Sequence, residues 1–234
     1  MQWCQDIPGP SPIVVFENGL AGHKEVWNEV VPTITADHAV FAYDRPGVGH
    51  SSETLRPRDG DTIVEDLRAL LQSRHLSPPY VLVGHSAGGL YLQLYARRYP
   101  MEVAALVLVD STHPTQFEGD GSMTHRGALS RAAMAVGLHG NAQQEFNALS
   151  ENGRQVLAAP PLTASIPLII LMAPDKSNSA IAAFDSAKRA DFARLYPSAA
   201  MRVVDSTHMI PQDQPQIVIE AIREITKRVA ADRL

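Results

Sequence analysis

Short apolar runs alternate with stretches of helical periodicity along most of the chain. Six of these runs are typical of buried strands, namely residues 13–16, 38–43, 80–83, 103–109, 167–172 and 201–204. Their nearly continuous apolar character indicates strands that are covered on both faces, as in a parallel sheet.

Helical stretches lie between these runs. Thr62 and Glu65 have the spacing of a capping box, with Thr62 as the N-cap. Two apolar stripes at helical spacing follow, at Ile63, Leu67, Leu70 and Leu71, and at Ile217, Val218, Ala221, Ile222, Ile225 and Val229. The alternation predicts an α/β fold, a doubly wound and mostly parallel sheet flanked by helices.

Residues 112–165 interrupt the alternation because they contain no convincing strand. Helical pieces are predicted over 128–136 and 142–149, with glycines between them. An insertion of this length is usually functional, and its apolar helical faces need something to cover. We therefore expect a small helical lid over 112–165, rather than a surface loop, on a core formed by 1–111 and 166–234.

Composition narrows the function classes. Hydrophobic residues make up 45% of the 234 residues and the formal net charge is −5, so nothing suggests a nucleic-acid partner. Cys4 is the only cysteine, which excludes an intrachain disulfide and a thiolate metal cluster. No apolar run is long enough to span a bilayer, and no signal peptide is evident. We expect a cytoplasmic protein, and monomer and dimer both stay open.

The strongest functional motif is Gly-His-Ser-Ala-Gly-Gly at residues 84–89. Its G-x-S-x-G pattern lies between the predicted strand 80–83 and a helical stretch over 90–98, which is the setting of a nucleophile elbow. The bare pattern has about a one-in-ten chance of arising in a chain of this length. A catalytic role for Ser86 therefore requires a base, an acid and an oxyanion hole elsewhere in the chain.

Reactive side chains follow four of the predicted strands. Ser86 comes after the third strand, Asp110 after the fourth, Asp175 after the fifth and His208 after the sixth. Because the carboxyl ends of parallel strands meet at one edge of a sheet, these residues should gather there. Their order is Ser, Asp, His, which is the order of the nucleophile-elbow fold.

A serine hydroxyl needs an adjacent base to become nucleophilic. His208 is the only histidine after the last predicted strand, and we assign it as the base. A carboxylate must fix the imidazole tautomer, and both Asp110 and Asp175 can do so, whereas Asp205 is too close to His208 along the turn.

The oxyanion needs backbone N–H donors. We assign them to Ala87, directly after the nucleophile, and to Leu20, in the turn after the first predicted strand. Gly19 allows the backbone to approach there. Asp44 and Arg45 are expected to hold a loop near the site.

The remaining histidines are expected to be structural. The turn places His85 beside Ser86 and prevents it from acting as the base. His113, His125 and His139 match no metal-binding spacing and are expected in the lid or at the pocket rim.

Together, these motifs resemble the α/β-hydrolase-fold serine esterases. The resemblance rests on Asn18-Gly19-Leu20 before Trp27, the run Tyr-Asp-Arg-Pro-Gly-Val-Gly-His-Ser-Ser over 43–52, the elbow at 84–89 and Ser206-Thr207-His208. It extends over residues 12–228 and implies a Ser-Asp-His triad with no cofactor and no metal. The resemblance is specific to the superfamily and not to a substrate.

The chain departs from the family pattern at two places. Asn18-Gly19 replaces the usual His-Gly of the oxyanion turn, which backbone donors tolerate. The family fold usually opens with two antiparallel strands, whereas 12 residues precede the first predicted strand here. The chain is naturally short, truncated, or keeps only an edge strand near Trp3.

The resemblance also bears on the acid. The common family pattern is Gly-x-x-Asp, and in Ala173-Pro174-Asp175-Lys176 the aspartate stands one residue early. Other members carry the acid where Asp110 stands. We favour Asp110 and keep Asp175 as the alternate acid.

The expected function is hydrolysis of small-molecule carboxylic esters, of short acyl chain, through an acyl-enzyme on Ser86. A lactonase or a hydroxynitrile-lyase-like enzyme on the same triad is an alternative. A ligand-sensing homologue that turns over slowly is another. An epoxide hydrolase or dehalogenase would need an aspartate at position 86.

Overall fold

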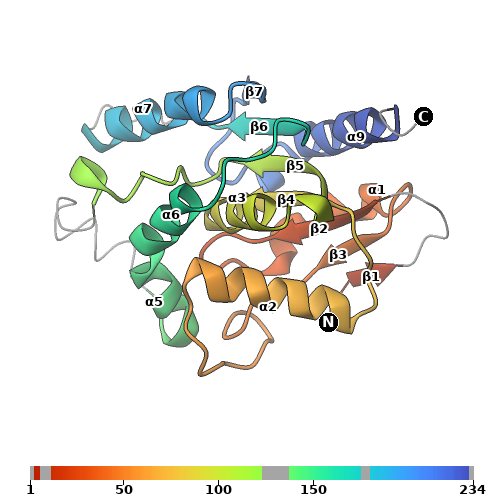
Figure 1. Cartoon of the computed structure of the whole chain (residues 1–234), viewed down its shortest axis with the longest axis horizontal. Helices are drawn as coiled ribbons and strands as arrows, with labels where there is room; N and C mark the ends of the chain where they lie inside the picture. The colour runs from red at the N-terminus through yellow and green to blue at the C-terminus, as the bar shows by residue number, and fades with distance from the viewer. Residues whose placement is uncertain (1–2, 6–11, 123–136, 175–179, 232–234) are drawn as a thin grey trace.

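The part of the chain described by the computed structural model, residues 3–5, 12–122, 137–174 and 180–231, forms a sheet of seven strands. The strand order is β1-β3-β2-β4-β5-β6-β7. Strand β1 pairs antiparallel with β3, and every other neighbouring pair is parallel. This is the mostly parallel, doubly wound sheet that the strand–helix alternation predicts (Figure 1).

All six predicted strands are present, together with a short edge strand near the N-terminus. The strands are β1 (Trp3–Gln5), β2 (Ile13–Glu17), β3 (Val40–Ala42), β4 (Tyr80–His85), β5 (Val103–Val109), β6 (Leu168–Met172) and β7 (Ala200–Val203). The helices are η1 (Lys24–Trp27), α1 (Val31–Ile34), α2 (Gly60–Ser73), α3 (Ala87–Arg98), η2 (Pro100–Glu102), η3 (Gly119–Gly121), α5 (Gly140–Asn147), α6 (Leu149–Ala158), α7 (Ala180–Leu195), α8 (Ile210–Asp213) and α9 (Pro215–Ala231). Within the described residues, no helix is long and apolar enough to cross a membrane.

The sheet is buried on both faces, which explains its continuous apolar strands. Alternate residues of each strand point to opposite faces, so that Leu82 and Leu106 enter one core while Val81 and Val107 enter the other. The first core is completed by α2, α3, α6 and α7, and the second by η1, α1 and α9.

The predicted capping box of α2 is wrong by one turn. The helix begins at Gly60, and its N-cap is Asp59, whose carboxylate accepts a hydrogen bond of 3.1 Å from the Thr62 N–H. Thr62 therefore lies inside the first turn, where its hydroxyl also donates to Asp59. Aspartate caps as well as threonine does, and Glu65 pairs instead with Arg56.

The predicted lid segment connects β5 to β6. The helix expected over 142–149 is present as α5, and α6 follows it without a counterpart in the sequence prediction. Helix α6 packs against α2 and α3, and its Val156 is fully buried in the first core (Figure 1). The helix predicted over 128–136 lies outside the described residues. The division into a core and a lid stays a prediction.

Candidate functional site

Ser86 occupies a sharp turn between β4 and α3. Its backbone has φ 54° and ψ −124°, in a region that residues with a side chain rarely adopt. The turn requires glycine on both sides, since a Cβ on Gly84 would lie 2.7 Å from the Cα of Gly89. A Cβ on Gly88 would lie 2.3 Å from the carbonyl oxygen of Asn18. The glycines of the motif therefore let three backbone segments meet at Ser86.

Backbone strain is concentrated around this turn. Four non-glycine residues in the described part of the chain have positive φ, and three of them, Ala21, Ser86 and Asp110, come from the loops after β2, β4 and β5. Such conformations cost free energy and persist where the surrounding structure holds them. The strained positions thus coincide with the sheet edge at which the reactive residues were predicted.

His208 and Asp110 form a direct pair at this edge. The Nδ1 atom of His208 lies 2.7 Å from Oδ2 of Asp110. Asp110 follows β5 directly and its side chain is 3% exposed, whereas the His208 side chain, in the turn after β7, is 52% exposed. An ionised carboxylate is an acceptor only, so His208 Nδ1 carries the donated proton and Nε2 is free to accept one.

The second carboxylate oxygen of Asp110 is also held. It accepts a hydrogen bond of 3.0 Å from the Ala173 N–H, at the end of β6, and one of 3.4 Å from Arg189 Nε of α7. Burial by itself raises the pKa of Asp110. The hydrogen bond and charge of His208, with the charge of Arg189 and the Ala173 amide, outweigh this effect, so the pKa lies below its usual value. The carboxylate is therefore ionised and fixed in orientation.

Ser86 and His208 line one cavity of about 630 Å³, together with Gly19, Leu20, Gly22, His23, Glu25, Val26, His85, Met209 and Gln212. Within the described residues, no hydrogen bond joins the Ser86 and His208 side chains. Such contacts are often long in a ligand-free site and tighten in the complex with substrate. The two side chains nevertheless face the same space, as the strand-end argument predicts.

The backbone of His208 is anchored from two sides. Its carbonyl oxygen accepts a hydrogen bond of 2.9 Å from His85 Nε2, and the two imidazole rings lie 4.7 Å apart. On the other side, the Asp213 carboxylate accepts hydrogen bonds from Ser206 and Thr207 in the same turn. Burial, and the nearby charge of His208, lower the pKa of His85 to about 4. The geometry thus places His85 as a neutral support of the turn.

The orientation of the two predicted oxyanion donors follows from the hydrogen bonds of the preceding carbonyl groups. The Ser86 carbonyl accepts hydrogen bonds from Gly89 and Thr112, and the Gly19 carbonyl accepts one from Arg45. In a trans peptide the N–H points opposite to the carbonyl. The N–H groups of Ala87 and Leu20 therefore point away from these partners. Neither N–H donates a hydrogen bond to another part of the chain that the structure describes.

The other sequence candidates are dispersed. Asp175 and His125 lie outside the described residues. His113 is buried against Phe192 and its ring contacts the Thr115 hydroxyl at 3.0 Å, away from the cavity lining. His139 is exposed and contacts the Gly137 carbonyl at 3.0 Å.

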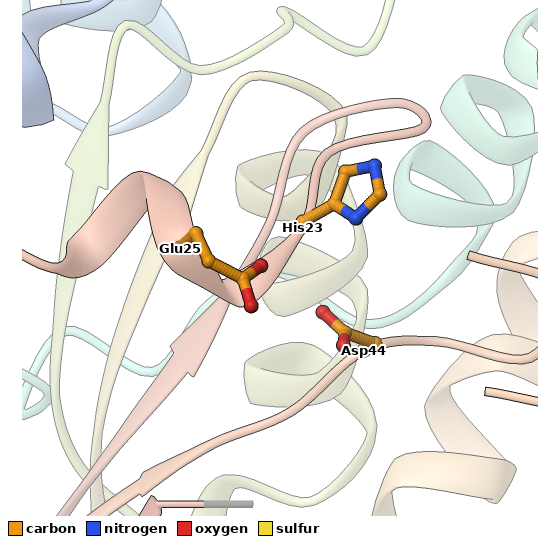
Figure 2. Close-up of side chains that lie close together, drawn as sticks. All are labelled: His23, Glu25 and Asp44. Carbon is orange, nitrogen blue, oxygen red and sulfur yellow. The ribbon is translucent and has the colours of Figure 1, made fainter. Parts of the chain in front are cut away.

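A cluster of possible metal ligands borders the cavity at His23, Glu25 and Asp44 (Figure 2). Figure 2 shows the two carboxylates turned toward one another, and the ligand atoms of all three residues lie within 4.8 Å. The Lys24 ammonium, however, lies 2.9 Å from Glu25 and 3.1 Å from Asp44. A metal would have to displace this cation, so the carboxylates act here as partners of Lys24.

Sequence reasoning missed three residues that support the site. Arg189 and the Ala173 amide hold Asp110, and Glu145 of α5 binds Arg45. A backbone amide carries no sequence signal, and neither Arg189 nor Glu145 stands in a recognisable motif. Only the fold brings them to the loops that they contact.

The architecture and this site define a class of proteins. The chain belongs to the α/β hydrolase fold family, whose model matches residues 12–132. It is 26% identical to the Bacillus subtilis protein YqjL over 216 residues, which cover 91% of this chain and 82% of that protein. It is 34% identical to a monoacylglycerol lipase of Mycolicibacterium smegmatis over 111 residues, covering 45% of this chain but only 39% of the lipase.

Solved structures share the fold at low sequence identity. A thermophilic esterase of Thermogutta terrifontis matches with a TM-score of 0.66 and 20% identity, covering 97% of this chain and 93% of the esterase. At this identity the likeness establishes the fold and leaves the substrate open.

Proposed function

We propose that the protein is a serine hydrolase that cleaves carboxylic esters through an acyl-enzyme on Ser86. The observation that carries the proposal is the 2.7 Å pair of His208 and Asp110 on the cavity that Ser86 also lines. An oriented imidazole beside a serine on a strained elbow is the arrangement that nucleophilic acyl transfer requires. The esterase and lipase relatives add support at the level of the family.

In the acylation step, His208 Nε2 takes the proton of the Ser86 hydroxyl while Ser86 Oγ attacks the ester carbonyl carbon. The negative charge that develops on the carbonyl oxygen is stabilised by the N–H groups of Leu20 and Ala87. The tetrahedral intermediate then collapses, and the alcohol leaves with the proton from His208. Asp110 stays ionised and stabilises the imidazolium.

Deacylation repeats the same steps with water as the nucleophile. His208 takes a proton from the water, whose oxygen attacks the acyl carbon on Ser86. Collapse of the second intermediate releases the carboxylic acid and returns the proton to Ser86 Oγ. The serine and the imidazole are regenerated, so none of these steps requires a cofactor.

The cavity favours small esters. Its volume of about 630 Å³ falls within the range of small-molecule sites. Leu20, Val26 and Met209 supply apolar lining, whereas His23, Glu25 and Gln212 supply polar groups. We therefore infer a substrate with a short acyl chain and a polar part.

A series of p-nitrophenyl esters with acyl chains of two to twelve carbons tests the proposal. Turnover should be highest for short chains and should be lost in Ser86→Ala. A p-nitrophenyl alkylphosphonate should modify the wild type once, with Ser86 Oγ displacing p-nitrophenolate at phosphorus, and should leave Ser86→Ala unmodified.

Two outcomes would contradict the proposal. Turnover that survives Ser86→Ala would exclude the acyl-enzyme on this residue. Binding of the esters without turnover would point to a ligand-sensing protein. Including a lactone in the same assay separates a lactonase from an open-chain esterase.

A further inference from the structure

A buried ion network joins α5 to the oxyanion loop, which we define as residues 18–22. Arg45 lies at its centre with a side chain that is 1% exposed, between the fully buried carboxylates of Glu17 and Glu145. Arg58, whose side chain is also fully buried, binds Glu145 from its other side at 3.1 Å. Burial lowers the pKa of Arg45, but the charges of Glu145 and Glu17 outweigh it and raise the pKa well above the usual range. Arg45 is therefore charged although it is buried.

Every N–H of the Arg45 guanidinium has an acceptor. A guanidinium offers five donors in a fixed plane. Arg45 Nε donates to Glu145 at 3.1 Å, Nη1 donates to Glu17 and to the Asn18 carbonyl, and Nη2 donates to Glu145 and to the Gly19 carbonyl. Because the guanidinium plane is rigid, the Glu145 carboxylate, bound along one edge, determines the direction of the N–H groups that hold the Asn18 and Gly19 carbonyls.

The Gly19 carbonyl is the critical contact. It accepts a hydrogen bond of 2.7 Å from Arg45 Nη2 and one of 3.0 Å from the Gly22 N–H of the same loop. These two contacts hold the peptide that joins Gly19 to Leu20, in which the Leu20 N–H points opposite to the Gly19 carbonyl. Arg45 supplies the one that comes from outside the loop. A rotation of the guanidinium would leave this peptide held only from within its own loop, so that the Leu20 N–H shifts away from the place where the oxyanion forms.

We infer that Glu145 of α5 is a positioning residue for the oxyanion hole and acts through Arg45 on the Leu20 N–H. This inference rests on the proposed function of the site. Glu145 is 100 residues from Arg45 in the sequence and is not among the residues that line the cavity. Docking of α5 is thus coupled to stabilisation of the transition state and not to substrate affinity.

Displacement of the Leu20 N–H should affect kcat because the oxyanion hole acts in the transition state. Its donors act on charge that develops in the transition state. A substrate in its ground state carries little of this charge, so a misplaced donor should lower kcat and leave KM nearly unchanged. Loss of a whole donor lowers kcat by about 10²- to 10³-fold, so displacement of one donor should lower it by about ten- to hundredfold.

Glu145→Gln tests the inference because it keeps the size of the side chain and removes its charge. The control is Glu151→Gln on α6, an exposed glutamate that pairs with Arg154 on the same helix. We expect Glu145→Gln to lower kcat about ten- to hundredfold at nearly constant KM, and to weaken inhibition by a trifluoromethyl ketone by a similar factor. Such a ketone places an oxyanion in the hole. Glu151→Gln should match the wild type in both measurements.

An NMR measurement makes the test independent of catalysis. The amide resonance of Leu20 should shift in Glu145→Gln and stay in place in Glu151→Gln. If wild-type protein hydrolyses no ester, the proposed function fails, yet an unshifted Leu20 amide still overturns the coupling by itself. If the wild type is active and a folded Glu145→Gln keeps its kcat, the positioning role is overturned.

Should Glu145→Gln fail to fold, Glu145→Asp replaces it. Aspartate keeps the charge and draws the carboxylate back by one methylene. A fall in kcat at constant KM with a shifted Leu20 amide supports the inference, and an unchanged kcat overturns it.

Discussion

Asp110 Oδ2 and His208 Nδ1 lie 2.7 Å apart, although 98 residues separate them in the sequence. Asp110 directly follows β5 and His208 follows β7, and β6 lies between these two strands in the sheet. The aspartate therefore reaches across the end of β6, whose Ala173 amide binds its second oxygen at 3.0 Å. The pairing depends on the strand order and could not be read from sequence spacing alone.

We predict that Asp110→Asn lowers kcat by about 10⁴-fold, the effect expected when the acid no longer fixes the histidine tautomer. The new amide group would turn N–H donors toward groups that now donate to the Asp110 carboxylate, such as His208 Nδ1 or the Ala173 N–H. The matched variant is Asp175→Asn, which should keep kcat within a few-fold of the wild type. Steady-state kinetics on one ester decides between them, and equal, mild losses in both variants would contradict the triad.

The strained backbone of Ser86 should lower the stability of the fold, and this effect can be measured separately from the catalytic role of the hydroxyl. With φ at 54°, replacement by glycine relieves strain that replacement by alanine keeps. We predict that Ser86→Gly is more stable than Ser86→Ala by about 1 kcal/mol in the free energy of unfolding, and that both are inactive. Urea denaturation measures this difference.

Ser186 supplies the control for this comparison, because it is exposed in the interior of helix α7. Glycine in a helix is less stable than alanine by about 0.5–1 kcal/mol. Ser186→Gly should therefore be less stable than Ser186→Ala, which is the opposite order. If glycine is less stable than alanine at position 86 as well, the elbow is not strained.

The sequence predicted the strands well because their burial on both faces gives continuous apolar runs. It also placed Ser86, Asp110 and His208 at strand ends that meet, and the structure brings the last two into contact. Local capping was less predictable, since Asp59 and Thr62 are both good N-caps and only the structure shows which one starts α2.

The support of the oxyanion loop illustrates what the sequence could not provide. Asp44 and Arg45 were expected to hold a loop. Asp44 accepts a hydrogen bond from the Lys24 N–H, and Arg45 donates to the carbonyls of residues 18 and 19. The partner carboxylate on α5 could not be predicted, because a single glutamate on an amphipathic helix usually faces solvent. Glu145 is buried because α5 packs with this residue against Arg45.

Gly88 should be required for full activity. A Cβ there would lie 2.3 Å from the Asn18 carbonyl oxygen and 2.6 Å from the Glu17 carbonyl oxygen, and both atoms belong to the backbone. We predict that Gly88→Ala displaces the oxyanion loop, lowering kcat by at least about tenfold and destabilising the fold by about 1–3 kcal/mol.

Gly137→Ala is the control for this variant. Gly137 has φ 79°, but a Cβ at this position would meet no described atom within 4 Å, so alanine is strained there without colliding. The variant should lose about 1–2 kcal/mol of stability and keep its kcat. Kinetics and urea denaturation on the two variants separate the effect of strain from that of loop displacement.

His85 should make the stability of the protein pH-dependent. Burial, with the nearby charge of His208, lowers its pKa to about 4, and burial lowers the pKa of His113 to about 4 as well. In the unfolded chain both imidazoles take up a proton near their ordinary pKa of about 6.5. Between these two values the unfolded state binds more protons, so the free energy of unfolding falls as the pH is lowered from about 6.5 to about 4.

Each pH unit in this window is worth at most about 1.4 kcal/mol per histidine. The contribution of Asp110, whose pKa is lowered from 3.8, is lost only at still lower pH, as the pH falls through its folded-state value. His85→Gln retains an amide donor for the His208 carbonyl and should flatten the slope between pH 6.5 and 4, leaving the part due to His113 and to His38, whose pKa burial also lowers. Urea denaturation across that range measures the slope, and an NMR titration should show the His85 ring neutral above pH 5. A His85 ring that titrates near pH 6.5, or a slope unchanged in His85→Gln, would contradict its assignment as a buried neutral support of the His208 turn.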